Sequence, residues 1–259
     1  MKNIAMTTIF GLLTVTPAFS QTTPTIEPAG MQIVWDSLKK EFNGFGIYNG
    51  TEGTNVTLAI KGGGKSIIAF NRKQSKVSIQ YGGKDLGGEF GSWGKFSEDG
   101  KIMRLEAKTD QLPAGKATNL KLTGSVEIVT ASKSETKSVG PQALKVGDKL
   151  TFGEDFTCEV TKLGKPTYGN DELEITFKWK HEISKLSAVR FFNKEGKEIE
   201  SKSSGRSSFG SLGKMTVTKS YKLKKKSDVL KIEMELWTDA ETVTVPLNVE
   251  LGLGGQVKS

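Results

Sequence analysis

The chain of 259 residues has one imidazole, His181, and one thiol, Cys158. Hydrolysis by a catalytic triad needs a base beside a nucleophile, and no G-x-S-x-G elbow accompanies this histidine. A zinc site usually draws several ligands from His and Cys, and one of each is too few. We therefore expect neither a triad hydrolase nor a transition-metal centre.

Both residues have a structural interpretation. His181 follows Trp179 with the same strand parity, at the end of an inward-facing row where a neutral histidine often closes a core. Cys158 alternates with Phe156 and Val160 on one strand face, so we expect a buried, inert thiol. The alternatives are a catalytic His181 and a reactive or intermolecular Cys158.

Acidic residues are the remaining source of chemistry. Turns at residues 98–99 and 170–172 could offer oxygen ligands to calcium, but no D-x-D-x-D-G loop is present. Two convergent carboxylates could support glycoside hydrolysis. The candidates for such a pair are Asp85, Glu89, Asp99 and Asp110. Because 29 acidic residues are scattered along the chain, this signal is nonspecific, and we predict no catalytic residue, no metal ligand and no cofactor.

Two tryptophans give a better argument for binding. Trp93 lies in a glycine-flanked loop, and Trp237 has the opposite strand parity from Met234 and Leu236, beside a turn. Exposed indoles stack on sugar rings or anchor protein partners. Alternatively, each indole folds over a sheet edge and caps the end of a core.

The basic residues suggest a class of partner. The formal net charge is +8, and one lysine cluster stands out. This cluster consists of Lys222, Lys224, Lys225 and Lys226. It favours an anionic polysaccharide or an envelope protein as the partner. Nucleic acid is a poor candidate, because no aromatic base-stacking motif accompanies the lysines.

The N-terminus reads MKNIAMTTIFGLLTVTPAFSQ, with a lysine, a short apolar run and small residues at Ala18 and Ser20. This pattern predicts a signal peptide cleaved after Ser20. No later segment approaches the roughly 20 apolar residues of a membrane span. We expect a periplasmic or extracellular protein that is monomeric or weakly associating.

Matching blocks recur in the same order along the chain. IIAFNRKQSK at 67–76 resembles VRFFNKEGKE at 189–198, and FGSWGK at 90–95 resembles FGSLGK at 209–214. SETKSVGPQALKVG at 134–147 loosely parallels AETVTVPLNVELG at 240–252. Such a repeat predicts two tandem copies of one domain. Because the two hexapeptides share Phe-Gly-Ser, Gly-Lys and an apolar central residue, we interpret them as architecture, with Phe90 and Phe209 anchoring each loop to its core.

Period-two alternation predicts the elements of each copy. Leu173, Ile175, Phe177 and Trp179 alternate with polar residues, as in a strand with one buried face. Short strands at regular intervals predict an all-β chain with two tandem immunoglobulin-like sandwiches. The expected boundaries are a signal peptide at 1–20, a flexible segment at 21–30, domains at 31–145 and 146–255, and a tail at 256–259. The one candidate helix spans residues 35–40.

The order of the motifs IIAFN, FGSWG, SEDGK, LKLTGSVEIVTA, ALKVGDKLTFG and LWTDAETVTVPLNVELGLG resembles a family of two-domain exported bacterial proteins found in planctomycete-like genomes. The resemblance implies export and two domains, and it brings no assigned activity. We therefore predict a non-catalytic binding or structural module. The alternatives are a carboxylate-dependent glycan-acting enzyme and an oligomerising spacer that pairs through an exposed sheet edge.

Overall fold

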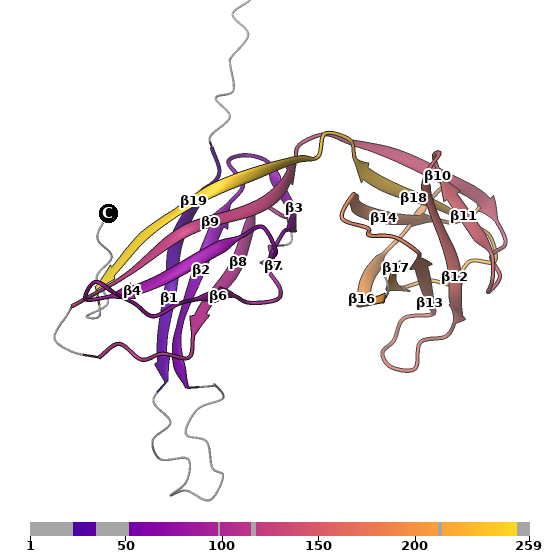
Figure 1. Cartoon of the computed structure of the whole chain (residues 1–259). Helices are drawn as coiled ribbons and strands as arrows, with labels where there is room; N and C mark the ends of the chain where they lie inside the picture. The colour runs from indigo at the N-terminus through magenta and orange to yellow at the C-terminus, as the bar shows by residue number, and fades with distance from the viewer. Residues whose placement is uncertain (1–22, 35–51, 98, 115–117, 212–213, 253–259) are drawn as a thin grey trace, which may run out of the picture.

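The computed structural model describes residues 23–34, 52–97, 99–114, 118–211 and 214–252 (Figure 1). Every regular element in these ranges is a strand, which confirms the all-β prediction. None of the described residues forms a helix of the length and apolarity that a membrane crossing requires. The predicted signal peptide at 1–20, the candidate helix at 35–40 and the predicted tail at 256–259 lie outside the described residues.

The strands are β1 (Thr25–Val34), β2 (Gly53–Lys61), β3 (Ser66–Phe70), β4 (Lys76–Tyr81), β5 (Lys84–Asp85), β6 (Glu89–Phe90), β7 (Lys95–Phe96), β8 (Ile102–Thr109), β9 (Asn119–Ala131), β10 (Ser134–Gln142), β11 (Lys149–Phe152), β12 (Phe156–Gly164), β13 (Leu173–Trp179), β14 (Leu186–Phe192), β15 (Glu198–Ile199), β16 (Ser201–Ser211), β17 (Lys214–Leu223), β18 (Leu230–Trp237) and β19 (Glu241–Gly252). Residues 25–30 were expected to be flexible, and this was wrong. They belong to β1, which pairs with β2 from Thr25 to Val34.

The first hydrophobic core lies between two antiparallel sheets. One sheet has the order β1-β2-β8-β6, with β7 also beside β8, and the other has the order β19-β9-β4-β5, with β3 also beside β9. Alternate residues such as Leu58, Met103 and Leu122 point inward and are fully buried. We call this part of the molecule the first sandwich.

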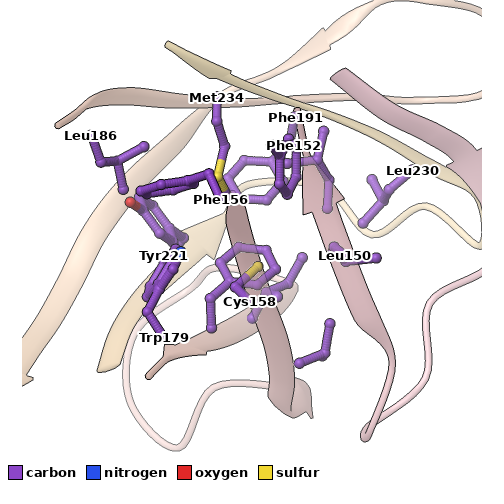
Figure 2. Packing of buried hydrophobic residues seen from close by; sticks show 14 of the residues in the cluster. Leu150, Phe152, Phe156, Cys158, Trp179, Leu186, Phe191, Tyr221, Leu230 and Met234 are labelled. Carbon is purple, nitrogen blue, oxygen red and sulfur yellow. The ribbon is translucent and has the colours of Figure 1, made fainter. Parts of the chain in front are cut away.

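The second core has the same two-sheet arrangement. Its sheets have the orders β10-β18-β14-β15 and β11-β12-β13-β17-β16. Aromatic rings fill much of this second sandwich, and the Phe177 ring packs against the rings of Phe191 and Tyr221. Cys158 is buried among them, as predicted (Figure 2). Burial raises the pKa of the Cys158 thiol to about 12, so the thiol stays protonated and unreactive.

The chain does not complete one sandwich before it starts the other. β19 pairs along its whole length with β9 and brings Val245, Leu247, Val249 and Leu251 into the first core. β10 instead pairs with β18 in the second sandwich. The expected domain boundaries, 31–145 and 146–255, are therefore wrong, because the second sandwich is inserted between β9 and β19 (Figure 1).

The two crossing strands are exchanged with matching register. Glu135 of β10 faces Leu236 of β18, and Glu241 of β19 faces Thr130 of β9. The same number of residues separates Thr130 from Glu135 as Leu236 from Glu241. Because the sequences of β10 and β19 are also similar, each copy of the repeat has its last strand in the sheet of the other copy.

The chain passes between the two sandwiches at two crossovers, residues 132–133 and residues 238–240. The Asp239 carboxylate joins these two crossovers. It accepts hydrogen bonds from the Ser132 hydroxyl at 2.6 Å and from the backbone N–H groups of Ser132 and Lys133 at 2.9 and 2.8 Å. The backbone N–H of Thr238 donates in return to the Lys133 carbonyl at 2.9 Å. The hydrogen bonds to Asp239, of which the one from the Ser132 hydroxyl has the largest effect, lower its pKa to about 2. Each of these bonds favours the charged form of the carboxyl group.

Replacement of Asp239 by Asn is expected to lower stability at pH 7 and to weaken its acid dependence. A carboxylate with a lowered folded-state pKa stabilises the protein above its unfolded value of 3.8, and this contribution disappears as the pH falls towards 2. Urea midpoints of the wild type and D239N should therefore differ at pH 7 and converge between about pH 4 and pH 2. A difference that does not change with pH would contradict this role.

The repeated hexapeptides lie at comparable sheet edges but differ in burial. Phe90 is only 3% exposed in β6, whereas Phe209 is 72% exposed in β16. The expectation that both phenylalanines anchor their loops was therefore wrong for Phe209. The edge at β6 and β7 consists of two short pieces, whereas β16 is one continuous strand that pairs with β17 throughout.

Candidate ligand-binding site

A hollow of about 840 Å³ surrounds Trp237 at one end of the second sandwich. Four chain segments form it: β10, the β11–β12 turn, the β13–β14 connection and the end of β18. Its walls include Glu135, Phe156, His181, Glu182, Lys185 and Trp237. We call this the Trp237 hollow.

Trp237 is half-buried at the end of β18, whose other residues alternate between buried and half-buried. Its parity was predicted correctly, because Met234 and Leu236 face the core while Trp237 does not. The Trp237 backbone N–H donates to the Lys185 carbonyl at 2.8 Å, which fixes the β13–β14 connection beside the indole. A rigid aromatic surface with one accessible part is suited to stacking on a ligand.

His181 lies in the wall of the same hollow. Its ring meets the Phe156 ring edge-on, with the centroids 5.4 Å apart, and the Phe156 ring also packs against Trp179. His181 thus closes the end of the aromatic row, as its parity predicted. Its Nε2 atom is buried and has no hydrogen-bond partner among the described residues.

Charged side chains of both signs surround these rings. Glu135, Glu154, Asp155 and Glu182 line the hollow together with Lys137 and Lys185. Two of the acids have basic partners, Glu135 with Lys137 at 2.9 Å and Glu182 with Arg206 at 3.3 Å. Carboxylates outnumber ammonium groups here, so the hollow suits a neutral polar ligand better than a polyanion.

Trp93 does not line this hollow. It lies between β6 and β7 at an edge of the first sandwich, where 78% of its surface is exposed. The structure therefore gives separate positions to the two tryptophans that the sequence singled out. Trp93 lies in an exposed loop, whereas Trp237 is part of a cavity wall.

The predicted lysine patch is largely engaged within the chain. Lys222 Nζ donates to the Tyr168 carbonyl at 2.8 Å, and Lys224 forms an ion pair with Asp171 at 3.3 Å. Lys202 also contacts this buried Asp171 carboxylate, at 3.1 Å. The hydrogen bond from Lys202, followed by that from Lys224, lowers the pKa of Asp171 despite its desolvation. Asp171 therefore neutralises part of the patch.

Lys225 and Lys226 remain exposed. With Lys224 they line a second hollow of about 770 Å³ that also contains Glu195, Glu198, Glu200 and Asp228. The backbone N–H of Lys226 donates to Glu172 at 2.8 Å. The acidic residues in this wall reduce its attraction for a polyanion.

Two of the carboxylates considered for glycoside hydrolysis, Glu89 and Asp110, line a hollow of about 560 Å³ in the first sandwich. Glu89 contacts Lys108 at 3.1 Å and Arg72 at 2.8 Å. The hydrogen bond from Lys108 is the largest of the causes that lower the pKa of Glu89. A glycosidase acid needs a raised pKa, so Glu89 is shifted in the unsuitable direction.

The acidic turns that were considered for calcium are also occupied by protein groups. The Ser97 hydroxyl donates to Asp99 at 2.6 Å, and Asp171 and Glu172 serve the lysine contacts described above. In the part of the chain that the structure describes, no three His, Cys, Asp or Glu side chains gather into a metal-binding group.

The composition of the Trp237 hollow was not predicted, because its walls come from segments that are distant in the chain. Residues 238–240 were expected to form an ordinary turn, although Asp239 joins the crossovers there. The similarity of β10 and β19, the strands that follow the two crossovers, was the sequence signal that could have indicated their exchange. Comparison of the chain with protein-family models, curated proteins and solved structures finds no match.

Proposed function

We propose that the protein is an exported, non-catalytic binding module, and that its second sandwich holds a neutral glycan segment at Trp237. One observation carries this proposal: a half-buried indole lines a hollow with polar and charged walls. Sugar rings have an apolar face that stacks on an indole, and their hydroxyl groups bind carboxylates, ammonium groups and imidazoles. The immunoglobulin-like character of the sandwiches is part of the proposal and is supported by their paired antiparallel sheets.

Walls of the hollow supply both halves of such recognition. Trp237 offers aromatic surface, and the rings of Phe156 and His181 line the hollow beside it. Glu135 and Glu182, which also line the hollow, can accept hydrogen bonds from sugar hydroxyl groups. The acidic excess opposes the anionic polysaccharide that the net charge alone favoured.

Replacement of Trp237 by Ala is expected to abolish glycan binding, because the stacking surface is lost while the β18 backbone remains paired. The probe is an array of neutral and acidic glycans and envelope polymers. We expect wild-type signals on a subset of neutral glycans and at least a tenfold loss in W237A, which corresponds to about 1.4 kcal/mol. W237F should retain part of the signal.

The matched control is W93A, which removes an equally large but fully separate indole from the first sandwich. Its signals should equal those of the wild type. If W237A and the wild type give identical signals, the Trp237 hollow is not the binding site. If W93A alone loses the signal, the function belongs to the β6–β7 loop instead.

A further inference from the structure

The sheet edge at β16 differs from the other long edges of the molecule. Among the described strands, the long outer strands β1, β10 and β19 contain Pro28, Pro141 and Pro246 respectively. The other outer strands have only two to five residues. β16 has 11 residues and no proline. Proteins usually protect long edges with proline, with short strands or with charged side chains. β16 contains Lys202 and Arg206 but no proline, so the backbone groups on its free side remain available to a partner of suitable charge.

Both faces of β16 are accessible. Residues 202–210 are all exposed, although the strand pairs with β17 throughout. Arg206 faces Lys219, and Ser208 faces the buried Val217. Residues directly opposite each other point to the same face of a sheet. The side chains of Arg206 and Ser208 therefore lie on the core-facing side of the sheet and are still exposed. A strand added beside β16 would have room for its side chains on both faces of the sheet.

The edge carries positive charge. Lys202 lies opposite Lys222, and Arg206 lies opposite Lys219, and like charges across a strand pair are unfavourable. Burial, with a smaller contribution from Arg206, lowers the pKa of Lys219. Asp171 compensates Lys202, and Glu182 compensates Arg206. The contacts of the described residues give Lys219 no carboxylate, only the Tyr221 ring at 5.2 Å.

Phe209 supplies an apolar contact on the opposite face of the strand. It lies opposite Thr216 and is among the most exposed apolar side chains of the described residues. The edge therefore offers a cationic pair on one face and an aromatic ring on the other. A strand in which acidic and apolar residues alternate would match both faces at once.

We propose that β16 binds an extended segment of a partner protein in which acidic and apolar residues alternate, and that this segment adds a sixth strand beside β16. Its carboxylates would face Arg206 and Lys219, and an apolar side chain would face Phe209. A second copy of this chain fits less well, because a β16 pair centred on Arg206 would bring two guanidinium groups together. This inference does not rest on glycan binding at Trp237, although Arg206 also forms an ion pair with Glu182 of that hollow.

The direction of the backbone N–H groups suggests a selective variant. The Lys224 N–H donates to the Glu200 carbonyl, and hydrogen-bonded pairs alternate with non-bonded pairs along an antiparallel ladder. When this alternation is followed across the irregularity between Ser203 and Gly205, the N–H of Ser208 points to the free side. Ser208→Pro therefore removes an N–H from the edge and leaves the pairing with β17 intact.

The test is selection of a displayed library of random decapeptides on the full mature chain, with counter-selection on S208P. We expect enriched peptides to carry Asp or Glu at alternate positions. The most enriched peptide, labelled with a fluorophore, should bind S208P and Arg206→Ser at least tenfold more weakly than the wild type. Ser208→Ala, which keeps the N–H, should bind like the wild type, and thermal midpoints of all four proteins should agree.

Three results would overturn the proposal. The first is a selection that yields no peptide whose binding depends on Ser208. The second is a set of enriched peptides that lack acidic residues. Alternatively, sedimentation shows a wild-type dimer that S208P abolishes, which would make a second copy the partner. If S208P is unfolded, the comparison of R206S with the wild type decides between an acidic partner and none.

Discussion

A chain that ends at Asp239 is expected to lose the fold of the first sandwich and to keep that of the second. β19 supplies four buried residues to the first core, and it pairs along its whole length with β9. The second core draws all its residues from the segment between β10 and β18. Removal of the C-terminal strand should therefore unfold the N-terminal part of the chain.

The size of the expected effect follows from the buried side chains. Each buried valine or leucine contributes about 1.5–3 kcal/mol, so the four residues of β19 contribute about 6–12 kcal/mol. A typical domain has only about 5–15 kcal/mol of stability. The loss therefore reaches the whole stability of the first sandwich, before the unpaired backbone of β9 is counted.

Two-dimensional amide NMR spectra of the truncated and full chains provide the measurement. Signals of the first sandwich should collapse into the narrow range of an unfolded chain, while those of residues 134–237 keep their positions. Addition of a synthetic peptide of residues 240–252 should restore the lost signals. The matched control is the same peptide with Val245 and Leu247 replaced by Ser, which cannot fill the core. Dispersed signals for both sandwiches without any peptide would contradict the exchange.

The alternation of residues predicted the strands well but not the sheet to which each strand belongs. Val243, Val245, Leu247 and Val249 alternate with more polar residues, which is sufficient to predict β19. Both β9 and β18 offer a suitable apolar partner face, and alternation cannot choose between them. The choice depends on the crossovers, where two or three residues and the Asp239 carboxylate direct each strand into the other sheet.

The candidate site shows a similar division. Parity placed Trp237 away from the core and His181 at the end of the Trp179 row, because both statements concern a single strand. The neighbours of Trp237 come from three other segments, and their meeting depends on long-range pairing that one strand does not encode. The lysine cluster was visible in the sequence. Its partial neutralisation by Asp171, which lies 53 residues before Lys224 in the chain, could not be predicted locally.

Replacement of Phe177 by Ala is expected to destabilise the second sandwich by about 3–5 kcal/mol and to leave the first unchanged. The Phe177 ring is fully buried, stacks on Phe191 at 6.3 Å and meets Trp179 and Tyr221 at 5.9 and 6.1 Å. Truncation to Ala would leave a cavity among rigid rings that cannot collapse into it, so the cost lies at the upper end for core residues.

Urea unfolding followed by amide NMR signals of each sandwich measures this effect, since every residue reports on its own core. Phe177→Leu refills most of the space and should cost less than Phe177→Ala. Phe96→Ala removes a half-exposed ring from the first sandwich and should change stability by no more than about 0.5 kcal/mol. If F177A lowers both midpoints equally, the two cores unfold as one unit, and the exchanged strands then transmit the loss from one sandwich to the other.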